Sequence, residues 1–118
     1  MIEEAELVML LGRVACGDQN AFSRLYETMS PRIYGLCMRL LGRQDLAEDV
    51  LQDAFVRIWH HAGEYHAERG TPAGWMLTVA RYRALDVLRR RRFELSLDHA
   101  SLTELADARL QATDAATD

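Results

Sequence analysis

The sequence has no lysine, only two cysteines and two prolines, and no apolar run of about 18 residues. Cys16 and Cys37 stand apart with no C-x-x-C pair, so a disulfide-stapled fold is not indicated and two buried free thiols are expected. The N-terminus begins acidic and carries no basic leader. We therefore expect a cytoplasmic chain without membrane insertion.

Sequence motifs for catalysis and metal binding are also missing. No E-x-x-H pair, H-E-x-x-H, P-loop or nucleophile elbow occurs. His60, His61 and His66 are close in sequence, but adjacent histidines at a helix end do not easily face one ion. The sequence predicts a protein that is not an enzyme and holds no metal and no cofactor.

The positive charge of the chain is local. The net charge is −4, yet residues 81–92 contain six arginines and one aspartate, so this segment is basic and the remainder is strongly acidic. Because lysine is absent, all 14 residues of the Lys and Arg total are arginines. A guanidinium can form a bidentate contact with a phosphate or stack on a base.

Apolar residues recur at helical spacing in four segments, and 118 residues suffice for one compact domain. Gly17-Asp18, Gly42 and Thr71-Pro72 punctuate the segments, and Asp45 with Glu48 forms a capping-box-like pattern. We predict an all-α bundle of about four helices, over residues 3–16, 21–41, 45–60 and 72–92, with a flexible linker from residue 94. Its core is expected from Leu7, Leu10, Leu11, Val14, Leu25, Met29, Ile33, Leu36, Cys37, Ala47, Leu51, Ala54, Ile58, Leu77, Ala80, Ala84 and Leu88.

Ser30-Pro31 interrupts the second segment. Proline removes one backbone hydrogen bond, so the segment is either one kinked helix or two helices with Ser30 as a cap. The apolar phase continues through the proline, which favours one kinked helix.

Two outer faces carry functional signals. On the third segment, acidic and polar residues surround one apolar residue, which fits either a solvated face or a docking site for a basic helix; they are Asp49, Gln52, Asp53, Val56 and His60. On the fourth, aromatic side chains lie beside cations, as in proteins that bind a nucleic-acid strand; this face carries Trp75, Val79, Tyr82, Asp86, Arg89 and Arg90.

The run DLAEDVLQDAFVRIW (45–59), followed by GTPAGWMLTVARYRALDVLRRRR (70–92), resembles the second conserved domain of bacterial sigma factors of the extracytoplasmic-function (ECF) group. The resemblance covers roughly residues 18–92. It implies a helical domain, residues 1–93, that binds the β′ coiled coil of the RNA polymerase core through Asp49, Gln52, Asp53 and Val56. It also implies an anti-sigma factor as a partner.

The resemblance further implies that the domain binds promoter DNA, through the non-template strand of the −10 element, and melts it. A flipped base would be held by the loop before the last helix, and that helix would lie against the DNA. The implied residues are Tyr65, His66, Arg69, Gly70, Thr71, Trp75, Thr78, Arg81, Tyr82, Arg83, Asp86, Arg89 and Arg90.

Two positions depart from the pattern of the group. Met76 stands where housekeeping sigma factors have a second tryptophan, which suggests weaker melting. Tyr82 stands where many relatives have asparagine, and a phenol cannot read an adenine edge bidentately.

Other functions fit parts of the sequence. A helical module that binds only a regulator would keep the fold without DNA binding, whereas a helix-turn-helix reader of duplex DNA lacks its short-turn helix pair. The group carries a further domain that reads the −35 element, so this chain is expected to be a fragment ending in the linker, residues 94–118.

Overall fold

A computed structural model describes residues 2–102, which contain four α-helices and two short 3₁₀ turns and no strand. The α-helices are α1 (Glu4–Ala15), α2 (Gln19–Leu41), α3 (Gln44–His61) and α4 (Pro72–Leu102), and the turns are η1 (Ala62–Glu64) and η2 (Ala67–Arg69). The predicted all-α class is confirmed. None of the helices in the described part is both long and apolar enough to cross a membrane.

The chain divides into two units, Met1–Ala84 and Leu85–Asp118, so that α4 begins in the first and continues in the second. A domain boundary between residues 93 and 94 stays a prediction, but the helix does not end at Arg92 as expected: α4 continues to Leu102. A predicted marginal helix over residues 101–110 lies mostly outside the described residues.

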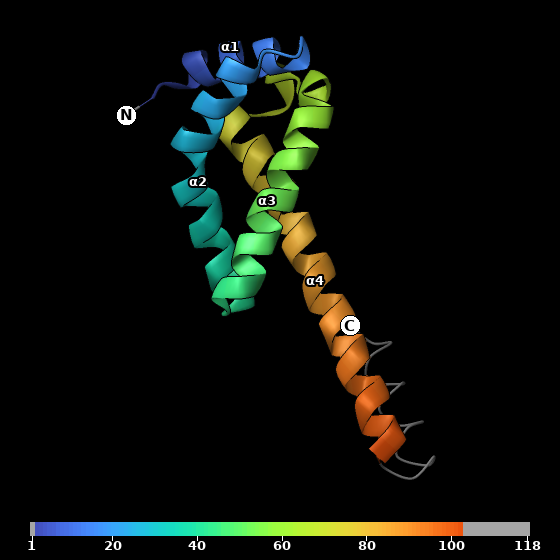
Figure 1. Cartoon of the computed structure of the whole chain (residues 1–118). Helices are drawn as coiled ribbons and strands as arrows, with labels where there is room; N and C mark the ends of the chain where they lie inside the picture. Colours follow the sequence, from blue (N-terminus) through green and yellow to red (C-terminus); the bar gives the residue numbers. More distant parts are fainter. Residues whose placement is uncertain (1, 103–118) are drawn as a thin grey trace. The chain divides into compact units, whose positions relative to one another are not determined.

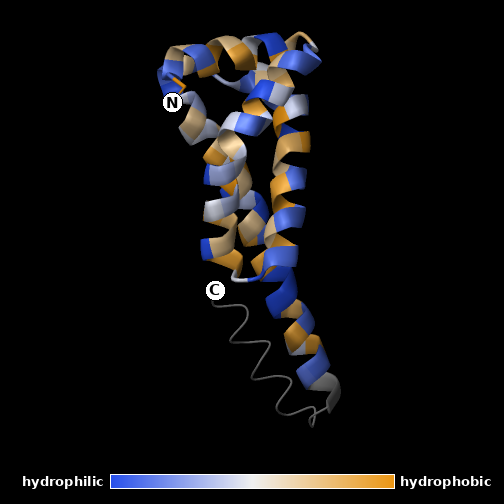
Figure 2. Ribbon diagram, turned by 60° about the vertical axis from the view of Figure 1, so that its left-hand side comes forward, coloured by the Kyte–Doolittle hydropathy of each residue, from blue (hydrophilic) through white to orange (hydrophobic). Residues whose placement is uncertain are grey.

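In the first unit, α2 and α3 run antiparallel and α1 crosses their ends (Figure 1). Edge-to-face ring contacts join α2 to α3, with ring centroids 5.2 Å apart for Phe22 and Trp59 and 6.0 Å apart for Phe22 and Phe55. Every predicted core residue of α1 and α3 is buried. Hydrophobic and hydrophilic residues alternate along the helices of the ribbon (Figure 2). Helical periodicity therefore located these two buried faces correctly.

The buried face of α4 differs in part from the prediction. In the first unit it consists of Ala73, Met76, Ala80 and Ala84, whereas the predicted core residue Leu77 is only half-buried. In the second unit the predicted core residue Leu88 is also only half-buried. Met76 is fully buried. The side chain at position 76 therefore contributes to the core of the first unit.

Helix ends follow local chemistry in most places. Gly42 caps α2 in the left-handed conformation, and α2 runs through Pro31 as a single helix, as predicted, while the kink at Pro31 stays a prediction. The capping box at Asp45 is wrong, because α3 begins at Gln44 and Asp45 accepts hydrogen bonds from the Arg43 guanidinium, at 3.1 Å from Nε and 2.7 Å from Nη2. These bonds hold the pKa of the Asp45 carboxyl below its usual value.

The prediction of two buried free thiols is confirmed for Cys37 and wrong in part for Cys16. Both are free, but Cys16 is exposed at the end of α1 and only Cys37 is buried. Burial raises the pKa of the Cys37 thiol, as expected for a structural cysteine in an apolar environment.

Asp18 caps the N-terminus of α2 with its side chain. Its carboxylate accepts hydrogen bonds from the backbone amides of Asn20 at 3.0 Å and Ala21 at 3.2 Å. Replacing Asp18 by alanine should lower the free energy of unfolding by about 1 kcal/mol, because two amides of the first turn lose their acceptor. Urea denaturation followed by circular dichroism measures this, and Asp18→Asn should recover most of the loss.

Candidate polymerase-docking and promoter-binding site

The loop between α3 and α4 and the first turns of α4 enclose a pocket of about 440 Å³. Seven of the residues predicted to bind DNA line it together, although they lie up to 13 positions apart in sequence. The lining consists of Glu64, Tyr65, His66, Arg69, Gly70, Thr71, Gly74, Trp75 and Thr78. We call this the loop pocket.

Tyr65 holds the loop in shape. Its hydroxyl donates a hydrogen bond to the carbonyl oxygen of Gly70 at 2.7 Å, and its ring centroid lies 6.0 Å from that of Trp75. Gly70 has φ of 144°, in a region that side chains rarely adopt, so glycine allows the sharp exit from η2. Tyr65 thus links the loop to Trp75, while His66 is exposed within the lining.

Thr71 organises the start of α4. Its Oγ1 accepts a hydrogen bond from the Gly74 amide at 3.0 Å, the cap that Thr71-Pro72 predicted. A Cβ added at Gly74 would lie 2.9 Å from this oxygen, closer than real Cβ atoms come. The small residue at position 74 therefore preserves the cap, and the Thr78 hydroxyl bonds to the Gly74 carbonyl at 2.9 Å one turn later.

Glu64 and Gly74 belong to the lining but were not predicted. Glu64 Oε2 lies 2.6 Å from Nδ1 of His61, which is in the last turn of α3. In the sequence, Gly74 is marked only by its position three residues after the capping Thr71. The backbone amide at that position is the usual donor to the capping side chain. For Glu64 the only signal was a carboxylate at the beginning of the loop.

The outer face of α3 presents the predicted docking residues. Asp49, Gln52 and Val56 are exposed, and Val56 keeps 54% of its surface accessible, so its apolar side chain is open to a partner. We call these three residues the docking face. Within residues 2–102, no ion pair or hydrogen bond engages the Asp49 side chain.

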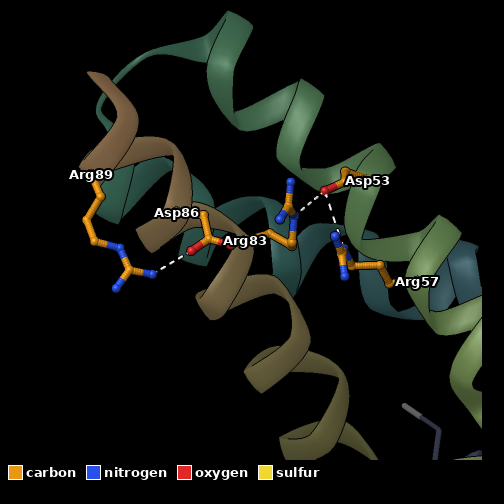
Figure 3. A network of polar contacts seen from close by, with 5 residues as sticks. All are labelled: Asp53, Arg57, Arg83, Asp86 and Arg89. Atoms are coloured by element: carbon orange, nitrogen blue, oxygen red, sulfur yellow. Dashed lines mark hydrogen bonds and ion pairs between the residues drawn. The ribbon is translucent and has the colours of Figure 1, made fainter. Parts of the chain in front are cut away.

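Asp53 and Arg83 were predicted to contact two different partners, yet they contact each other. Nε of Arg83 on α4 donates a hydrogen bond to Oδ2 of Asp53 on α3, and Arg57 Nε lies 3.7 Å from the same oxygen (Figure 3). The Arg83 side chain is 21% exposed and that of Asp53 38%. Two residues far apart in the sequence thus form a polar contact between α3 and α4 within the first unit.

The remaining predicted DNA residues of α4 are accessible. In the first unit Arg81 is exposed and Tyr82 is 63% exposed, so its ring is open for stacking. In the second unit, Arg89 and Arg90 are exposed, and Nη2 of Arg89 lies 2.5 Å from Oδ1 of Asp86 (Figure 3). Among the side chains that the structure describes, no group of three His, Cys, Asp or Glu residues could hold a metal ion.

Comparison with known proteins agrees with this geometry. The family model for sigma-70 region 2 matches residues 25–94, which contain the docking face and the loop pocket. The chain is 38% identical over 85 residues to "ECF RNA polymerase sigma factor SigK" of Mycobacterium tuberculosis (strain ATCC 25618 / H37Rv) and to that of Mycobacterium bovis (strain ATCC BAA-935 / AF2122/97), matching 72% of this chain and 46% of each relative.

The SigK protein of Mycobacterium sp. (strain KMS) is likewise 38% identical, over 84 residues that make up 71% of this chain and 44% of that relative. The chain therefore spans less than half the length of the curated relatives that it matches. Both the predicted resemblance and the relatives concern ECF sigma factors. The chain belongs to the sigma-70 family, through its region 2.

Proposed function

We propose that this domain docks on the β′ coiled coil of RNA polymerase and captures the non-template strand of a promoter −10 element during melting. The observation that carries the DNA part is the loop pocket, where Trp75, His66 and Arg69 surround one cavity. A base that leaves the stack must recover a few kcal/mol through stacking and polar contacts, and these side chains supply both kinds.

The lining suggests a division of labour within the pocket. Trp75 and the exposed His66 offer flat faces to a base, and Arg69 offers a cation to its edge or to a phosphate. Tyr65 is tied to Gly70 and Trp75, so we assign it to holding the loop rather than to primary stacking. Gly70 and Thr71 keep the backbone of the helix start accessible, and Thr78 adds a hydroxyl.

The helix after the pocket would follow the backbone of the DNA. Arg81, Arg89 and Arg90 are exposed and would neutralise phosphates, while Tyr82 would stack. Asp86, which lies beside Arg89, would orient this guanidinium. The domain would act without a cofactor and not as an enzyme, in the cytoplasm where promoter DNA is found.

The polymerase part rests on the docking face. A central exposed valine flanked by an aspartate and a glutamine suits a basic helical partner, because burial of the valine supplies affinity and the charges supply orientation. An anti-sigma factor that covers the same face is a further proposed partner.

Anisotropy of a labelled single-stranded DNA tests the DNA part. Single strands are first selected from a randomised pool with the purified chain. We expect their affinity for the domain to be low, but higher than that of the corresponding duplexes. If about four phosphates are neutralised, the log–log slope of affinity against salt should be about −3. Affinity that does not change with salt, or absence of binding to any strand, would favour the alternative of a module that binds only a regulator.

A further inference from the structure

We propose that Asp53 and Arg83 act as a brace that positions the promoter-binding helix on the docking helix, instead of contacting polymerase and phosphate directly. The inference rests on the proposed function for its binding readouts. Asp53 and Arg83 are positioning residues, because neither side chain needs to touch DNA or polymerase for the brace to act.

The geometry supports a brace in three ways. Arg83 Nε and Asp53 Oδ2 are hydrogen-bonded (Figure 3). Both side chains are partly withdrawn from solvent, whereas Asp49 and Arg81 are exposed. Asp53 and Arg83 are 30 positions apart and lie on different helices, so the contact joins α3 to α4. A contact within one helical turn would not do this. A charge-assisted bond with limited solvent access resists screening by salt better than an exposed pair does.

The Asp53–Arg83 pair lies close in sequence to both the docking face and the loop pocket. On α3, Asp53 follows Gln52 and lies one turn from Asp49, so it adjoins the docking face. On α4, Arg83 follows Tyr82 and lies two turns after Trp75 of the loop pocket. A change in the brace would shift the helix that carries Tyr82 and Trp75 relative to the helix that carries the docking face.

A charge swap separates the brace from direct contacts. Arg57 lies 3.7 Å from Asp53 and would repel an arginine there, so the swap is made with Arg57→Gln as the reference protein. In that reference, Asp53→Arg and Arg83→Asp alone should each weaken binding of a selected single-stranded DNA on the order of tenfold. The double variant should recover most of the affinity, because the opposite charges again face each other across the two helices.

Two further readouts distinguish a positioning role. If Arg83 bound a phosphate, its loss would make the salt slope shallower by about 0.7, whereas a brace leaves the slope unchanged. In urea denaturation, the two single changes should be strongly non-additive. As a control, the ion pair of Glu6 on α1 and Arg24 on α2 is 3.5 Å long, and its arginine side chain is 54% exposed, against 21% for Arg83. This pair should tolerate the same swap and its single changes with little effect on either readout.

The outcomes are distinct. Recovery of DNA affinity in the double variant supports the brace, and failure to recover together with a shallower slope for Arg83→Asp overturns it in favour of a direct phosphate contact. If the reference protein binds no DNA at all, the proposed function fails, but the denaturation cycle still decides the brace: additive single effects overturn it and coupled effects support it.

Discussion

Asp49→Arg is expected to weaken binding of the domain to a β′ clamp-helix fragment by at least about 30-fold, since central interface residues contribute about 2 kcal/mol or more. Asp49 is exposed and, within residues 2–102, has no side-chain partner, so its reversal changes the docking face without breaking an internal contact. The new arginine would also repel a basic partner. Isothermal titration calorimetry with the fragment measures the loss.

Two controls make the result interpretable. Glu27→Arg introduces the same change of charge at an exposed position of α2, and it should leave affinity for the fragment nearly unchanged. Val56→Ala tests the apolar part of the face without altering charge and should also weaken binding. Full affinity of Asp49→Arg, with an unchanged helical spectrum, would show that the fragment does not use this face.

Asp53 is a poorer probe than its sequence position suggested. A direct contact of Asp53 with the β′ coiled coil predicts that charge reversal there removes polymerase binding and leaves the fold intact. In the structure its carboxylate bonds to Arg83 on α4 and lies near Arg57, so reversal would place three cations together. A loss of binding in that variant could then arise from a displaced helix, which makes Asp49 the cleaner test.

Trp75→Ala is expected to weaken binding of a selected single-stranded DNA by about tenfold, because stacking of a base on an aromatic ring contributes about 1–3 kcal/mol. Trp75 lines the loop pocket and is half-buried, with its ring close to that of Tyr65. Fluorescence anisotropy at fixed salt measures the change. The salt slope should stay the same, since no phosphate contact is removed.

Conservative variants separate stacking from folding. Trp75→Phe keeps an aromatic face and should retain most of the affinity. Tyr65→Phe keeps the ring but removes the hydrogen bond to Gly70, so it should loosen the loop and cause a smaller loss. Equal losses for Trp75→Ala and Trp75→Phe would contradict a stacking role, and a large fall in thermal stability of Trp75→Ala would point to a structural one.

Helix boundaries illustrate how far local chemistry reaches. Asp18, Gly42 and Thr71 cap helices where the sequence predicted them, because a cap requires only neighbours within one turn. Asp45 does not, although its pattern with Glu48 looked similar: the nearby Arg43 guanidinium engages the carboxylate. A competing side chain of this kind is not visible in the spacing of a capping motif.

The sequence by itself determined the all-α class, the buried faces of α1 and α3, and the family, since periodicity and motif order are properties of one segment at a time. It did not determine which side chains meet. Only the tertiary structure brought Glu64 and Gly74 into the loop pocket, buried Met76 in place of Leu77, and paired Asp53 with Arg83. The physical reason is that such contacts depend on the rotation and spacing of helices packed against each other, which side chains far apart in the chain fix together.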